Sequence, residues 1–367
     1  MNPQIFLPKE IYVERDVADT PLAKFVLNTN PAANKHSIDS INQIINQYNE
    51  IDNTHKSQNV LLIAKQRGPF LKLCPGTSRH ICCLYQILNV ATNCNLNCTY
   101  CILQCYLNNP YITFYANLND LWQELDEKIA NRPDKIIRLG TGELTDSLAF
   151  DHLYPFSRDL VEYFNDKSHA LFELKSKTDN IDNILDLDHK RRTVVSWSLN
   201  AEAIVKSEEA KAPSLEKRFA AARKAQDAGY RLGFHFDPMI WHEGWEKGYK
   251  EVVDRIFTVA RPDNISWISL GALRYPPELD AIIRERHPQS DIVLGELFPG
   301  KDGKFRYFKP QRIIMFKKMY EWIRNYSEQV FVYLCMESDE VWRKSFGWSP
   351  GKSSELARLL DERVALP

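Results

Sequence analysis

The stretch CNLNCTYC, residues 94–101, holds three of the eight cysteines of a 367-residue chain, and Cys105 follows four residues later. Thiolates at such close spacing bind zinc or an iron–sulfur cluster. Zinc sites usually combine two ligand pairs far apart in sequence, whereas all the candidates here lie on one loop. Three thiolates suit three corners of a [4Fe–4S] cluster whose fourth iron stays open to a small molecule. We therefore expect Cys94, Cys98 and Cys101 to bind this cluster, with Cys105 as no ligand.

Strands and helices alternate regularly around the cysteine loop. The expected strands are residues 81–93, 135–143, 170–177, 193–200, 230–238 and 265–275. The expected helices between them are residues 118–129, 153–164, 181–187, 214–229 and 245–257, and the fourth has Ser214 as its N-cap and Gly229 as its C′ residue. Six strand–helix units in order are typical of a parallel sheet with crossover helices. Six is short of the eight in a full barrel, so we predict an α/β fold, a partial (β/α)6 TIM-type barrel.

The cysteine motif and its position in this barrel support each other. CxxxCxxC on the loop after the first barrel strand is the signature of radical S-adenosylmethionine (SAM) enzymes. The barrel is therefore predicted to be of radical SAM type, with SAM as the second cofactor. In such barrels the chemistry gathers at the C-terminal ends of the strands.

Polar residues and glycines follow several of the expected strands, as a SAM pocket requires. The sequence GTGE, residues 140–143, offers backbone carbonyls and one carboxylate to the SAM ammonium. Lys177 suits the SAM carboxylate, and Ser198 with Asn200 suit the ribose hydroxyls or the carboxylate; a tight turn, a surface lysine and helix caps are the structural alternatives. The predicted cofactor-binding residues, with His235 and Asp237 at the rim, are Gly140, Thr141, Gly142, Glu143, Lys177, Ser198, Asn200, His235 and Asp237.

The barrel divides the chain into three predicted parts. Residues 1–80 are an N-terminal extension with an amphipathic helix near residues 38–51 and a strand from residue 60, and residues 81–286 are the barrel. Residues 287–367 form a C-terminal region with a β-hairpin turning at residues 299–303, a helix over 311–326 and a strand over 329–337.

The bulk composition limits the function classes. The net charge is −1, so a polyanionic partner requires a local basic patch. The first residues lack the pattern of a signal peptide, and no stretch approaches the roughly 18 apolar residues of a membrane span. We expect a cytoplasmic protein without a membrane partner, in which clustered cysteines are metal ligands rather than disulfides.

With these motifs, the chain resembles the spore photoproduct lyase family of radical SAM proteins from about residue 74 to about residue 342. The resemblance is carried by CPGT, CNLNCTYCILQ, GTGELTDS, KSKT, SWSLN, FHFDP and DGKFRYFKP. It implies a DNA-repair lyase that cleaves the methylene bridge between two thymines of a UV photoproduct. In this family a 5′-deoxyadenosyl radical takes a hydrogen from C6 of the lesion, a cysteine returns a hydrogen, and tyrosines beside the last cluster cysteine relay the radical to SAM.

The sequence departs from the family pattern at two positions. The family carries its hydrogen-donor cysteine in a CTSD-like segment, where this chain has ELTD, so Glu143 stands in that place. Tyr100 before the last cluster cysteine remains, but Ile102 follows it. A carboxylate cannot donate the hydrogen atom. We therefore expect Cys74 or Cys105, both on loops, to be the donor, with Tyr100 as the relay.

The resemblance also assigns DNA contact to the late hairpin. Residues 301–319 contain seven lysines and arginines against one acidic residue, and aromatic residues interleave with them. Basic groups bind phosphates and aromatic rings stack on bases, so Lys304, Arg306 and Tyr307 are the predicted contacts. The expected partners are UV-damaged DNA and a low-potential electron donor of the flavodoxin or ferredoxin type. The protein itself is expected to be a monomer.

Two other functions compete with DNA repair. The first is a radical SAM enzyme on the same scaffold that acts on modified RNA or a small metabolite. The second is a zinc-stabilised nucleic-acid-binding module without catalysis, in which Cys94, Cys98, Cys101 and Cys105 form a zinc knuckle.

Overall fold

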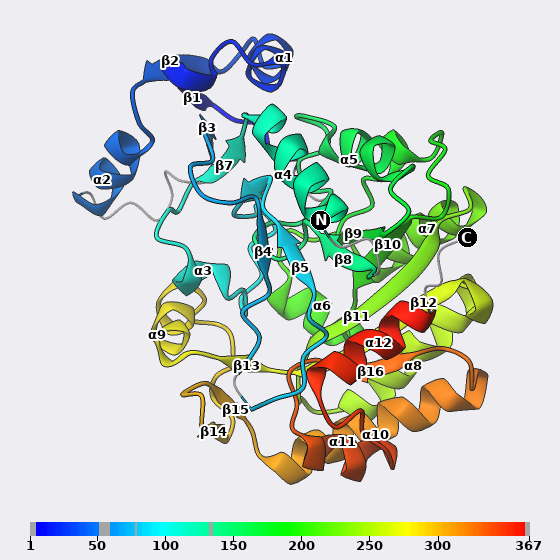
Figure 1. Cartoon of the computed structure of the whole chain (residues 1–367). Helices are drawn as coiled ribbons and strands as arrows, with labels where there is room; N and C mark the ends of the chain where they lie inside the picture. Colours follow the sequence, from blue (N-terminus) through cyan, green and yellow to red (C-terminus); the bar gives the residue numbers. More distant parts are fainter. Residues whose placement is uncertain (1–4, 51–58, 78, 132–134, 364–367) are drawn as a thin grey trace.

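The computed structural model of the chain describes residues 5–50, 59–77, 79–131 and 135–363. Its largest sheet has eight strands in the order β16-β12-β11-β10-β9-β8-β5-β4. Figure 1 shows this sheet curling through the middle of the molecule, with helices on its outer side. The strands are β4 (Leu71–Leu73), β5 (Gln86–Leu88), β8 (Ile137–Gly140), β9 (Ala170–Ser176), β10 (Thr193–Ser198), β11 (Arg231–Met239), β12 (Ile265–Ala272) and β16 (Val332–Leu334).

The six predicted barrel strands are confirmed as a parallel series in chain order. Each of β5, β8, β9, β10, β11 and β12 pairs parallel with the next. β16 adds a further parallel strand beside β12, and β4 pairs antiparallel with β5 at the other edge. A partial barrel results, so the C-terminal ends of these strands share one edge.

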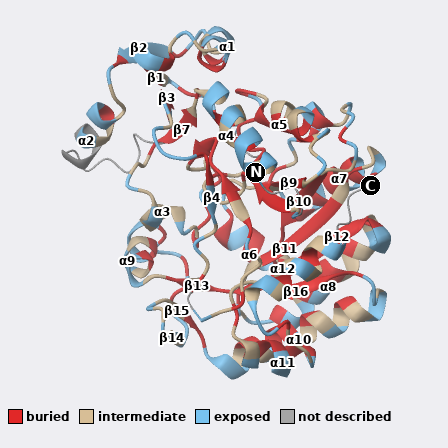
Figure 2. Cartoon of the chain, in the orientation of Figure 1, coloured by how far each residue is buried: buried red, intermediate tan, exposed pale blue. Residues whose placement is uncertain are grey.

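The burial of both faces of these strands explains why they could be predicted from the sequence. All eight residues of β12 are buried, as are all six of β10, because helices cover the outer face and side chains fill the inner one. Figure 2 shows the buried strands surrounded by helices with exposed outer faces. The outer helices are α4 (Leu118–Ala130), α5 (Phe156–Phe164), α6 (Glu202–Glu208), α7 (Leu215–Asp227) and α8 (Trp245–Val259).

The predicted ends of α7 are both confirmed. The Ser214 side chain accepts a hydrogen bond from the backbone N–H of Lys217, and Gly229 has a positive φ of 94°. The expected helix over residues 181–187 is shorter than predicted, a 3-10 turn η3 (Asp182–Ile184).

A second sheet, with strands in the order β2-β1-β3-β7-β6, stands beside the barrel. Its elements are β1 (Glu10–Glu14), α1 (Pro21–Thr29), β2 (Asn34–Ile38), α2 (Asn42–Glu50), β3 (Val60–Ala64), β6 (Ala91–Thr92) and β7 (Ile112–Tyr115). The amphipathic helix and the strand from residue 60 are confirmed as α2 and β3. The predicted strand 81–93 is in fact two strands, β5 in the barrel sheet and β6 in this one. The sheet therefore takes strands from both sides of residue 80, and the three-part division of the chain stays a prediction.

The C-terminal region is built around a small antiparallel sheet in the order β13-β15-β14. The predicted hairpin is confirmed as β14 pairing with β15. The elements are β13 (Arg274–Tyr275), α9 (Pro277–Arg286), β14 (Leu297–Pro299), β15 (Phe305–Tyr307), α10 (Lys309–Tyr326), α11 (Asp339–Phe346) and α12 (Ser353–Arg363). Within the described ranges, every helix is too short or too polar to span a bilayer.

The buried carboxyl group of Asp151 precedes α5 and binds the first turn of this helix. The backbone N–H of Ser157 donates to Asp151 Oδ1 at 3.0 Å, the Ser157 hydroxyl donates to Oδ2, and Asn183 Nδ2 donates to Oδ2 at 3.2 Å. Burial raises the pKa of Asp151 from 3.8 to about 6, although these hydrogen bonds act in the opposite direction. The protonated carboxyl is thus favoured in the folded chain, and its contribution to stability is lost as the pH rises through 6.

We expect the substitution Asp151→Asn to remove this pH dependence. Between pH 7 and pH 5, the free energy of unfolding of the native chain should rise by about 1 kcal/mol relative to the Asn variant. Urea unfolding of both proteins at the two pH values measures this difference. An unchanged difference would mean that Asp151 titrates near its ordinary pKa.

Candidate functional site

The cysteine loop follows β6 and is held by the last residue of α6 and the segment after that helix. The Thr99 N–H donates to the Glu208 carbonyl at 2.9 Å, and the Lys211 N–H donates to the Leu96 carbonyl at 3.2 Å. Asn93 and Asn97 have positive φ values of 67° and 53°, which asparagine tolerates better than most residues. The backbone therefore fixes the loop on both sides of Cys98.

The three predicted cluster ligands lie on this loop as free thiols. Cys98 is buried, while Cys94 and Cys101 are partly buried. Burial raises the pKa of Cys98 to about 12 and also raises the pKa of Cys101, and the ammonium of Lys177 acts against burial at both. Soft thiolates are the ligands of iron–sulfur clusters, so the donor set and the nearby positive charge fit a [4Fe–4S] cluster.

A buried ion pair ties this loop to the barrel. The Tyr100 hydroxyl donates to Glu209, and the other carboxylate oxygen of Glu209 pairs with Arg218 of α7. Arg218 also donates to the carbonyls of Ser198 and Pro213, each at 3.0 Å. Both charged side chains are at most 1% exposed. This pair was not predicted, although Arg218 stands three residues after Leu215 on the buried face of a helix with apolar neighbours.

The glycines of the GTGE turn are required by close packing. A Cβ atom on Gly140 would lie 2.0 Å from the Tyr85 hydroxyl oxygen and 2.3 Å from the Glu173 carbonyl oxygen. A Cβ atom on Gly142 would lie 2.7 Å from Lys175 Cβ. The end of β8 thus approaches β9 more closely than a residue with a Cβ atom would allow. The expected contact of this turn with SAM stays a prediction.

Asp146, three residues after Glu143, joins the turn to the end of β9. Its Oδ1 accepts from the Ser176 hydroxyl at 2.7 Å, and its Oδ2 accepts from the Lys177 N–H at 2.7 Å. Beside it, the Thr145 hydroxyl donates to the Asn93 carbonyl at 2.7 Å. These bonds hold the cysteine loop, the turn and Lys177 together. Asp146 was not predicted, although it lies inside the quoted GTGELTDS motif.

The remaining predicted SAM residues fall into two groups. The Lys177 Nζ lies 5.7 Å from the centre of the Tyr100 ring, beside the cysteine loop. Ser198 is buried at the end of β10. By contrast, the Asn200 side chain already donates to the Pro238 carbonyl at 2.9 Å and accepts from the Tyr249 hydroxyl at 2.5 Å. Its side chain therefore holds β11 and α8 in place.

His235 lies inside the barrel and not at its rim, which corrects the sequence expectation. Its Nδ1 is 2.6 Å from the Ser269 hydroxyl, and its Nε2 is 2.8 Å from Glu173 Oε1. The Trp267 indole also donates to Glu173, at 3.1 Å. Burial raises the pKa of Glu173, but His235 and the other neighbours outweigh it, and the pKa falls to about 2. Side chains that point into a parallel barrel stack in layers. The network around Glu173 forms the layer directly below the strand ends.

Two ion pairs and one thiol lie closer to the strand ends than this network does. Asp237 of β11 binds Arg274 through two hydrogen bonds of 3.0 Å, and Arg274 also donates to Cys335 Sγ at 3.5 Å. Glu143 forms an ion pair with Lys175 of β9. Asp237 is among the charges that act on Lys175, so the two ion pairs are neighbours.

The two predicted hydrogen donors have different surroundings. Cys74 lies between β4 and β5, where burial and then the charge of Glu143 raise its pKa to about 11. Cys105 lies on the short helix α3 (Leu103–Tyr106), and its thiol donates to the Ile102 carbonyl at 3.3 Å. Its main charged neighbour is Glu278 of α9. The charge of Glu143 thus reaches Cys74, while Cys105 lies on a short helix that packs beside α9.

The hairpin residues correct a further expectation. Arg306 and Tyr307 are buried, because β15 is the central strand of its sheet. Arg306 pairs with Asp302, and the Tyr307 hydroxyl accepts from the Trp241 N–H at 3.1 Å. Lys304 is partly exposed. The outer face instead presents two rings, whose centres are 5.3 Å apart, on Phe298 and Phe308.

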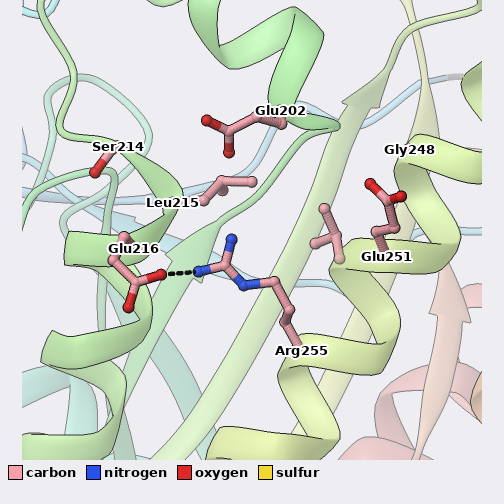
Figure 3. Close-up of a pocket in the computed structure, with 8 residues that line it drawn as sticks. Glu202, Ser214, Leu215, Glu216, Gly248, Glu251 and Arg255 are labelled. Atoms are coloured by element: carbon pink, nitrogen blue, oxygen red, sulfur yellow. Dashed lines mark hydrogen bonds and ion pairs between the residues drawn. The ribbon is translucent and has the colours of Figure 1, made fainter.

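A hollow of about 270 Å³ lies outside the barrel between α6, α7 and α8 (Figure 3). Glu202, Glu216 and Glu251 line it, and Arg255 reaches across to Glu216. None of the predicted site residues lines this hollow, so it is separate from the strand-end site.

Comparisons with known proteins agree with this geometry. The family described as "Spore photoproduct lyase" matches residues 6–334. The chain is 26% identical over 298 residues to the spore photoproduct lyase of Geobacillus sp. (strain Y412MC61), covering 79% of this chain and 86% of that protein. It is also 26% identical over 298 residues to that of Bacillus subtilis (strain 168), covering 79% of this chain and 85% of the relative.

A solved structure shares the fold. A spore photoproduct lyase mutant with bound AdoMet and dinucleoside spore photoproduct superposes with a TM-score of 0.78 at 24% identity, covering 91% of this chain and all of that one. The predicted α/β fold with a partial barrel is therefore confirmed.

The cysteine loop predicts a clear pattern of iron binding. Because three thiolates are needed for three irons, Cys94→Ala, Cys98→Ala or Cys101→Ala should each lose the brown [4Fe–4S] chromophore. Cys105→Ala is the matched control and should keep it. Anaerobic reconstitution followed by absorbance, iron and sulfide analysis measures this. A colourless Cys105→Ala protein beside a brown Cys98→Ala protein would contradict the assignment.

Proposed function

Because the chain belongs to the spore photoproduct lyase family, we propose that it is a radical SAM lyase that repairs spore photoproduct in UV-damaged DNA. The observation that carries the proposal is the meeting of the cysteine loop, the glycine turn and Lys177 at one edge of the barrel, joined by Asp146. The family's use of a [4Fe–4S] cluster and SAM argues against the zinc-stabilised binding module. Membership of the spore photoproduct lyase family favours the DNA lesion over another radical SAM substrate.

The chain's own residues prepare the site for these cofactors. When bound, the cluster and SAM supply the 5′-deoxyadenosyl radical that takes a hydrogen from the lesion. Cys94, Cys98 and Cys101 hold the cluster, and the carbonyls of the turn with Lys177 bind the amino acid part of SAM. The Glu209–Arg218 pair fixes the loop from below, and the buried network around Glu173 closes the barrel beneath the site.

Cys74 is the better of the two predicted hydrogen donors. A donor thiol must touch the carbon radical left when the methylene bridge breaks. The charge of Glu143, which occupies the place of the family's donor, acts on Cys74, whereas the main charge that acts on Cys105 is that of Glu278 on α9. The Cys74 S–H bond would break homolytically, and the hydrogen atom would form a C–H bond on the product and leave a thiyl radical. Tyr100 stays the expected relay.

DNA is proposed to approach over the outer face of the hairpin. Lys301 and Lys304 flank the turn, and Phe298 with Phe308 are 45% and 54% exposed. Cations bind phosphates, and exposed rings stack on or wedge beside unpaired bases. Arg306 and Tyr307 support the hairpin from inside. The flavodoxin- or ferredoxin-type reductant, the monomeric state and the cytoplasmic location are further parts of this proposal.

Incubation with the lesion tests the proposed function. The reconstituted, reduced protein should form 5′-deoxyadenosine from SAM and convert dinucleoside spore photoproduct to thymidine products, both followed by chromatography. Formation of 5′-deoxyadenosine without any repair would favour a different substrate. Intact SAM with a reduced cluster would exclude radical SAM chemistry.

Cys74→Ala should change the products and not the initial attack. We expect hydrogen abstraction from the lesion to continue while the product radical, which lacks a donor, ends in adducts. Cys105→Ala should give clean repair. Mass spectrometry of the lesion products distinguishes the two. Clean thymidine products from Cys74→Ala at the native rate would place the donor elsewhere.

The exposed hairpin residues should bind DNA electrostatically. Lys301→Ala with Lys304→Ala should lower the slope of log affinity against log salt by about one unit for each lost phosphate contact. Lys250→Ala on the outer face of α8 is a control that should leave the slope unchanged. Fluorescence anisotropy at several salt concentrations measures it, and equal slopes would show that DNA binds another face.

A further inference from the structure

Glu143 and Lys175 form an ion pair that is open to the site. Glu143 follows β8 and Lys175 lies near the end of β9, and their side chains are 34% and 18% exposed. The pair can form because Gly142 leaves room: a Cβ atom there would lie 2.7 Å from Lys175 Cβ and 2.8 Å from the Lys175 carbonyl oxygen. The turn is thus shaped around the lysine side chain.

This pair has spare hydrogen-bonding capacity. Within the described ranges, each of the two side chains has the other as its one hydrogen-bond partner. An ammonium has three donors and a carboxylate about four acceptor sites, so donors and acceptors remain for a ligand. The neighbouring Arg274 is different, because it already binds Asp237, the Ala272 carbonyl and Cys335.

The proposed hydrogen donor indicates where the lesion lies relative to this ion pair. The Cys74 N–H donates to the Tyr85 carbonyl at 2.9 Å, and the Tyr85 hydroxyl lies against Gly140, three residues before Glu143. The charge of Glu143 also acts on the Cys74 thiol, so the thiol and the pair are close to each other. If Cys74 transfers a hydrogen atom to the lesion, a thymine ring must lie against this thiol. The same ring then lies within reach of Glu143 and Lys175.

The chemistry of thymine matches the pair. Its pairing edge is an imide, in which N3–H stands between the O2 and O4 carbonyls, and enzymes read extruded bases at this edge. We propose that Lys175 donates to a carbonyl oxygen of one thymine of the lesion while Glu143 accepts from its N3–H. This inference rests on the proposed function and assigns Glu143 to the substrate and not to the SAM ammonium. The backbone carbonyls of residues 140–142 remain for SAM.

Kinetics with the dinucleoside lesion and an analogue methylated at both N3 atoms test this reading. Lys175→Met and Glu143→Ala should each raise KM for the lesion about tenfold or more, because a charged hydrogen bond is lost, with a smaller change in kcat. N3-methylation should weaken binding to the native protein by a similar factor. It should have no further effect on Glu143→Ala, because the acceptor is already gone.

A matched control and a second readout keep the test decisive. Lys250→Met removes an exposed ion pair with Asp254 on α8 and should leave KM unchanged. Cluster absorbance reports that each variant is folded, and if Lys175→Met loses it, the N3-methyl comparison with Glu143→Ala decides. A native enzyme that repairs no lesion refutes the proposed function and this inference together. Repair with unchanged KM in Glu143→Ala, or equal N3-methyl effects in both proteins, overturns this inference alone.

Discussion

The ion pair between Glu209 and Arg218 is the interaction on which the arrangement of the site depends. Both charges are removed from water, which is unfavourable unless each is fully paired and hydrogen-bonded. Here the guanidinium also binds two carbonyls, and the carboxylate receives the Tyr100 hydroxyl. One pair thereby fixes the position of the cysteine loop relative to β10 and α7.

The close approach of β8 to β9 is the second constraint. Two glycines let the strand ends meet without side chains between them. Asp146 then accepts from a hydroxyl and an N–H at the end of β9 and from the N–H groups of Leu148 and Ala149 on its own side. The polar groups of the site are consequently held by short local contacts. The barrel itself supplies only the common edge.

Sequence reasoning found the barrel because its strands are buried on both faces and give long apolar runs between helices. It predicts the cluster ligands because their spacing is set by the cluster itself, and that assignment stays a prediction. It missed β1, β2 and β7, which lie in a sheet whose order is not the order of the chain. It could not place His235, Arg306 or Tyr307, because whether a polar residue faces solvent or a neighbouring strand depends on tertiary packing. Glu209 was missed because it follows the end of α6, while its partner Arg218 lies on α7.

The shared sheet beside the barrel has a consequence for how the chain can be divided. β6 ends two residues before Cys94, and it pairs with β7, which in turn pairs with β3. The segment that leads into the cysteine loop is therefore anchored on strands from the beginning of the chain. Removing the first 80 residues would leave β7 as an open edge and release one support of the cysteine loop. The amino-terminal sheet thus supports the segment that carries the cysteine loop. It is not a separate module that evolution or engineering could exchange freely.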